Sequence, residues 1–126
     1  MPGMAKLNLS GAQQAQLLFL NSLPPKFERI HRLVEEIASL QGGETTVKTL
    51  CRILDESRNQ ASMLLLNSLA DTFGMMSMVA RRGGGLQMKV RALREGQASL
   101  KTNFDGALRA ASTPEGKPGD EDDEEE

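Results

Sequence analysis

The side chains that most often carry chemistry are scarce in this sequence. It contains a single histidine, His31, and a single cysteine, Cys51. A catalytic histidine needs a nucleophile or an orienting carboxylate nearby, and one nitrogen and one sulfur ligand are too few for an ordinary zinc site. The sequence places His31 at the edge of a core and Cys51 inside it as a small hydrophobic residue. We therefore expect no enzyme activity, no catalytic residue, no cofactor and no metal ion.

The glycine-rich run at residues 81–85, RRGGG, invites comparison with loops that bind phosphate. A P-loop requires two glycines separated by four residues, then Lys and Ser or Thr, after a strand, and the run meets none of these conditions. A connector between antiparallel helices explains the glycines better. Methionines gather around this connector and suit either core packing or an adaptable partner groove: Met75, Met76, Met78 and Met88.

The clearest pattern lies between Leu86 and Ala111, where mostly apolar residues recur at alternating steps of four and three. Such a heptad seam is typical of coiled-coil packing, and Gln97 is its one polar member beside a glycine. Three cations at steps of three and seven flank the seam on one ridge. We expect the seam to bind a partner by packing, through Leu86, Val90, Leu93, Leu100 and Phe104. The charged residues of the ridge would determine which partner binds: Arg91, Arg94 and Lys101.

The net charge of −2 conceals an uneven distribution of charge. Residues 1–114 contain 14 Lys and Arg against 9 Asp and Glu, whereas residues 115–126 contain one Lys against 8 Asp and Glu. The body therefore carries +5 and the C-terminal segment −7. The ridge then has three interpretations: a solvated face that tunes partner choice, a phosphate-contacting surface with which the acidic segment competes, or a surface for an anionic membrane or acidic helix.

Helical periodicity divides the body into four segments. Ser10 and Gln13 form a capping box before a first helix over residues 11–22. Residues 24–25, both Pro, end that helix and begin a second that stops at residues 42–43, both Gly. A third pattern runs from 46 to 82, about 55 Å if unbroken, with Gly74 as the point where it would kink. The fourth helix covers residues 86–111.

These segments predict an all-α fold of three or four antiparallel helices, with a long helical hairpin of coiled-coil character and disordered termini. The expected connectors are residues 23–25, 41–45 and 82–85. We expect a flexible arm over residues 1–9, the helical domain over 10–111 and a disordered acidic tail over 112–126. Aromatic residues make up only 3% of the chain, which disfavours β-sandwiches and barrels and stacking on single-stranded nucleic acid.

The sequence favours a non-enzymatic helical adaptor or structural subunit of a larger intracellular assembly, which binds a helical subunit or a second copy. The alternative is a nucleic-acid-binding or chromatin-associated protein that uses the basic fourth helix and is modulated by the acidic tail. Binding to a membrane is disfavoured, because Trp and Tyr are absent and no apolar run exceeds four residues. The single cysteine indicates an intracellular location, and the charge pattern slightly favours the nucleus over the cytoplasm. Ser112 and Thr113, before a proline and an acid, are candidate phosphorylation sites.

Overall fold

Five helices make up the part of the chain that the computed structural model describes, residues 9–114. No strand occurs in that range, and the expected all-α fold is confirmed. Most of the expected N-terminal arm and acidic tail, residues 1–8 and 115–126, lies outside the described residues. The helices are α2 (Gly11–Asn21), α3 (Leu23–Ala38), α4 (Gly43–Met63), α5 (Asn67–Arg81) and α6 (Leu86–Ala111).

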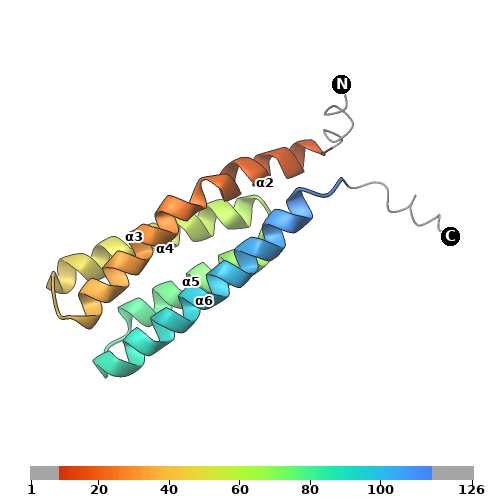
Figure 1. Cartoon of the computed structure of the whole chain (residues 1–126). Helices are drawn as coiled ribbons and strands as arrows, with labels where there is room; N and C mark the ends of the chain where they lie inside the picture. Colours follow the sequence, from red (N-terminus) through yellow and green to blue (C-terminus); the bar gives the residue numbers. More distant parts are fainter. Residues whose placement is uncertain (1–8, 115–126) are drawn as a thin grey trace.

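The capping box predicted at Ser10 begins α2. The Ser10 hydroxyl accepts a hydrogen bond from the Gln13 backbone nitrogen at 3.0 Å, and the Gln13 side chain accepts one from the Ser10 backbone nitrogen at 3.0 Å. Only Ser22 separates α2 from α3, and its backbone is helical, with φ −90° and ψ −6°. The two helices therefore follow one another along one line in Figure 1. The expectation that prolines near residue 24 would reverse the chain is wrong, because they occupy the first turn of α3, where no amide donor is needed.

The expected long third helix is two helices. It breaks at residues 64–66 and continues without a kink through Gly74. Leu65 has a left-handed backbone with φ 61°, and the amides of Leu64 and Leu66 both donate to the Ala61 carbonyl, at 3.1 and 2.9 Å. This hydrogen-bonded helix end lets α5 fold back along α4. The break was not visible in the sequence because leucine replaces the glycine that usually marks this conformation.

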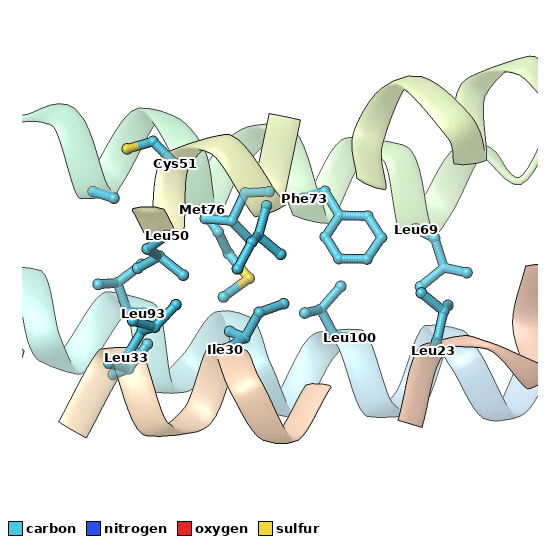
Figure 2. Packing of buried hydrophobic residues seen from close by; sticks show 14 of the residues in the cluster. Leu23, Ile30, Leu33, Leu50, Cys51, Leu69, Phe73, Met76, Leu93 and Leu100 are labelled. Atoms are coloured by element: carbon cyan, nitrogen blue, oxygen red, sulfur yellow. The ribbon is translucent and has the colours of Figure 1, made fainter. Parts of the chain in front are cut away.

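Four helices, α3 to α6, pack into an antiparallel bundle, with α2 extending α3 at one end (Figure 1). α5 packs between α4 and α6, and α3 closes the bundle by contacting both α4 and α6. The core lies along the axis, where Figure 2 shows Phe73 and Met76 of α5 facing Ile30 of α3 and Leu100 of α6. The predicted helical hairpin is therefore present as α5 and α6, but it lies inside the bundle and does not extend beyond it.

Side-chain hydrogen bonds join neighbouring helices around this core. Arg81 donates to the Ser77 hydroxyl at 2.8 Å, and that hydroxyl donates to Asp55 of α4 at 2.7 Å. Arg81 also pairs directly with Asp55, and hydrogen bonding to Arg81 lowers the pKa of the Asp55 carboxyl. On α6, Asn103 donates to the Thr72 hydroxyl of α5 at 2.7 Å. The order of the helices is thus fixed by polar contacts as well as by burial.

Gly96 permits the close approach of α5 and α6. A Cβ atom at this position would lie 2.5 Å from Cγ of Met76, a fully buried side chain. At Gly106, on the same helix, an added Cβ atom would meet nothing within 4 Å.

We expect Gly96→Ala to lower the free energy of unfolding by about 1–2 kcal/mol through overpacking. Gly106→Ala, the control, should raise it by about 0.5–1 kcal/mol through helix propensity. Urea denaturation measures both, and equal gains would show that the helices do not meet closely at Gly96.

The left-handed residue at the chain reversal provides a second test. Leu65 is exposed, so Leu65→Ala and Leu65→Gly both remove a side chain with few contacts. Because the left-handed conformation costs a residue with a Cβ atom roughly 1–2 kcal/mol, we expect the glycine variant to be the more stable by about 1 kcal/mol. At Leu18, which is equally exposed but lies inside α2, the order should reverse, since glycine weakens a helix interior. Thermal unfolding of the four variants gives the comparison, and alanine proving better at both positions would contradict it.

Candidate partner-binding groove

The chain's own helices cover most of the heptad seam on α6. Leu93 is fully buried, and Val90 and Leu100 are 6% and 2% exposed. Figure 2 shows Leu93 and Leu100 among side chains of the other helices. The expectation that Leu93 and Leu100 bind a partner is wrong, whereas Val90 is buried but borders the groove described below. A four-helix bundle uses the same alternation of four and three as a coiled coil between chains, so the spacing did not reveal which helices would bury the seam.

Phe104, the last large seam residue, also packs inside the chain. It is half-buried, and its ring lies edge-on to Phe27 of α3, with centroids 5.5 Å apart and planes at 82°. One turn before it, Lys101 is exposed and makes no ion pair within residues 9–114. The contact between α3 and α6 thus continues along the C-terminal half of α6.

At the other end of the seam, α3 and α6 leave an open groove of about 650 Å³. α3 ends at Ala38, so the first turns of α6 extend beyond it, and the small side chains of Ala38 and Ala98 leave the space unfilled. We call this hollow the α3–α6 groove; it is lined by Ala38, Leu86, Gln87, Val90, Arg91, Arg94, Glu95 and Ala98. It brings together four of the eight predicted partner-binding residues, Leu86, Val90, Arg91 and Arg94.

An ion pair across α3 and α6 closes one side of the groove. Arg94 donates to both carboxylate oxygens of Glu35, from Nη2 at 2.7 Å and from Nε at 3.0 Å. These hydrogen bonds lower the pKa of the Glu35 carboxyl, and the same contact raises the pKa of Arg94. Arg91, three residues earlier, is exposed and has no ion pair within the described residues. Of the two arginines in the groove, Arg94 is therefore paired across α3 and α6, and Arg91 has no such partner within residues 9–114.

The other residues that the sequence singled out for possible chemistry or modification lie within the bundle or just after α6. His31 Nδ1 lies 3.2 Å from Oε1 of Gln97, the polar member of the seam, and so links α3 to α6. Cys51 is buried, and burial raises the pKa of its thiol. Ser112 and Thr113 are exposed after the end of α6, where the Thr113 hydroxyl donates to the Arg109 carbonyl at 2.8 Å. Their phosphorylation stays a prediction.

Comparison with family models, with curated proteins and with solved structures found no match. Within residues 9–114, no three His, Cys, Asp or Glu side chains are placed to hold a metal ion. In the same residues, no helix combines the length and the apolar character that crossing a membrane requires. The candidate site therefore rests on the shape and charge of the groove.

The sequence did not indicate four of the residues that line the groove: Ala38, Gln87, Glu95 and Ala98. Ala98 follows Arg91 and Arg94 at steps of three and four, so helical spacing places it on the same ridge. The small size of Ala98 did not by itself indicate a groove, because the groove also depends on where α3 packs on α6. Ala38 contributes to the groove only through the packing of α3 on α6, which depends on tertiary structure.

The Glu35–Arg94 pair predicts a pH-dependent coupling between α3 and α6. Because the folded-state pKa of Glu35 lies below its ordinary value of 4.5, its stabilising effect is complete above that value and is lost as the pH falls through the lowered pKa. A double-mutant cycle with Glu35→Gln, Arg94→Gln and the combined variant measures this coupling by urea denaturation at low salt. We expect coupling near neutral pH that disappears in acid. A coupling independent of pH would contradict the ion pair.

Proposed function

We propose that the chain is a non-enzymatic helical adaptor or structural subunit of a larger multiprotein assembly, and that it binds a helix of a partner in the α3–α6 groove. The observation that carries this proposal is the groove itself, an apolar hollow open to solvent beside a core that is already complete. The partner therefore adds to the outside of the bundle, whereas the sequence favoured packing along the whole heptad seam of the fourth helix.

The lining of the groove suits an amphipathic helix. Leu86 and Val90 provide the apolar edge, and Ala38 and Ala98 let another backbone approach closely. Grooves of this kind bind the apolar stripe of a helix through residues spaced three and four apart. Arg91 supplies a charge at the rim that favours a partner carrying a carboxylate there, and such rim charges contribute more to partner choice than to affinity.

The nucleic-acid alternative receives less support from the same residues. It rested on the charge split and on the basic fourth helix, whose ridge of Arg91, Arg94 and Lys101 was expected to contact phosphates, and Arg94 is paired with Glu35. On that ridge Arg91 and Lys101 remain, ten residues apart on α6, and the ridge alone makes a weak surface for nucleic acid, because affinity grows with the number of phosphates neutralised. As part of the proposal we place the assembly inside the cell, since the single cysteine of the chain cannot form an internal disulfide.

The test introduces two carboxylates into the groove. Arg91→Glu with Ala98→Glu changes two exposed positions, so the bundle should stay folded while a docked helix meets repulsion and lost contact. The tagged chain is recovered with its native partner, the partner is identified and purified, and binding is measured by calorimetry. We expect the affinity to fall by about tenfold or more, equivalent to about 1.4 kcal/mol.

Arg29→Glu with Ala12→Glu is the matched control, because both positions are exposed and neither lines the groove. It should bind as the unaltered chain does. A partner that binds both variants equally would show that the α3–α6 groove is not its site. Substitutions of Leu93 and Leu100 by Asp do not test the proposal, because both side chains belong to the core and their replacement would unfold the chain.

A further inference from the structure

A second groove, of about 670 Å³, lies at the end of the bundle where α5 passes into α6. Its apolar wall consists of Val47 and Cys51 of α4 and Ala80 of α5. Cys51 lies at the edge of the packed cluster drawn in Figure 2. The groove shares no residue with the α3–α6 groove and takes no part in the proposed binding of a partner helix.

Cations from three elements converge around this hollow, which we call the basic groove. Lys48 and Arg52 lie one turn apart on α4, Arg81 and Arg82 end α5, and Lys89 belongs to the first turns of α6. Asp55 neutralises Arg81, so four cations that form no ion pair within residues 9–114 face two remaining carboxylates, Glu44 and Glu56, in the lining. The pKa of the Cys51 thiol is raised by burial and by the charge of Asp55, while the charges of Arg81 and Lys89 oppose that rise. The residues that line the groove carry a net positive charge.

We propose that the basic groove binds the acidic segment of a second copy of this chain, residues 120–126. That segment reads DEDDEEE and is the densest negative charge in the sequence. No single pair is strong, because exposed ion pairs contribute about 0–1 kcal/mol each. Several pairs formed by one segment add together, and their sum is screened by salt. The contact is thus weak, multivalent and dependent on ionic strength.

The number of residues after Pro114 limits whether the acidic segment can bind the basic groove of its own copy or only that of another copy. The connection between α5 and α6 lies at the opposite end of the bundle from the end of α6 (Figure 1). Lys89 precedes the last residue of α6, Ala111, by 22 positions, or about 33 Å of helix. From Pro114 to the first acid of the run, Asp120, even a fully extended chain spans only about 20 Å. At the same extension Asp123 lies about 30 Å from Pro114, so the first four acids of the run, residues 120–123, cannot reach the basic groove of their own copy, whereas Lys101 and Arg109 lie within their reach.

The experiment measures association directly. A fluorescent peptide of residues 115–126 is titrated with the chain truncated after Pro114, which retains every residue of the core, and the peptide's anisotropy is followed at low and high salt. In parallel, the full chain and the truncated chain are compared by sedimentation velocity. We expect the peptide to bind at low salt and to be released at high salt, and only the full chain to self-associate.

Charge reversal then locates the site. Arg82→Glu with Lys89→Glu should weaken peptide binding about tenfold, or about 1.4 kcal/mol, and should abolish self-association of the full chain. Lys101→Glu with Arg109→Glu makes the same change of charge on the part of α6 that the segment can reach in its own copy, and should leave both unaffected.

Three outcomes would overturn the proposal. These are a full chain that stays monomeric at low salt, peptide binding that is lost in the Lys101 and Arg109 variant instead, and equal loss in both double variants. The second would assign the segment to its own copy, and the third would indicate attraction without a site. Because none of these variants alters the α3–α6 groove, failure here and failure of the proposed partner groove can be told apart.

Discussion

Two backbone hydrogen bonds to the Ala61 carbonyl, from the amides of Leu64 and Leu66, turn the chain back at the end of α4. The rest of the structure depends on this reversal. A continuous helix over the same residues would carry Phe73 and Met76 away from α4, and the apolar face of α6 would find no partner on that side. With the reversal, α5 lies between α4 and α6, and the seam of α6 is buried inside one chain.

Burial of the seam changes where the molecule can interact. Seam residues such as Leu93 and Leu100 are buried within the chain and are not available to other chains. Interaction surfaces remain where helices of unequal length leave hollows: the α3–α6 groove beside the end of α3, and the basic groove where α5 ends. Both are lined in part by arginine or lysine.

The two hollows differ in the kind of contact they favour. The α3–α6 groove has small apolar side chains, and Arg91 is its one cation without an ion pair among the described residues, beside Glu95; this suits a packed helix whose affinity comes from buried surface. The basic groove collects four cations from three elements that form no ion pair in residues 9–114, which suits an extended anionic segment whose affinity comes from charge and falls with salt. The proposed binding of a partner helix and the proposed self-association therefore involve different residues of the chain.

The sequence by itself determined the all-α class, the capping box at Ser10, the bounds of α6 and the split between a basic body and an acidic C-terminal segment, because these follow from local periodicity, backbone preferences and charge. It did not reveal the reversal at Leu65, since a left-handed leucine has no local signature. Nor did it show that Arg94 would pair with Glu35, 59 residues away in the chain. Tertiary structure alone decided which helices cover the seam and where the grooves lie, because both depend on helix lengths and neighbours that heptad spacing does not encode.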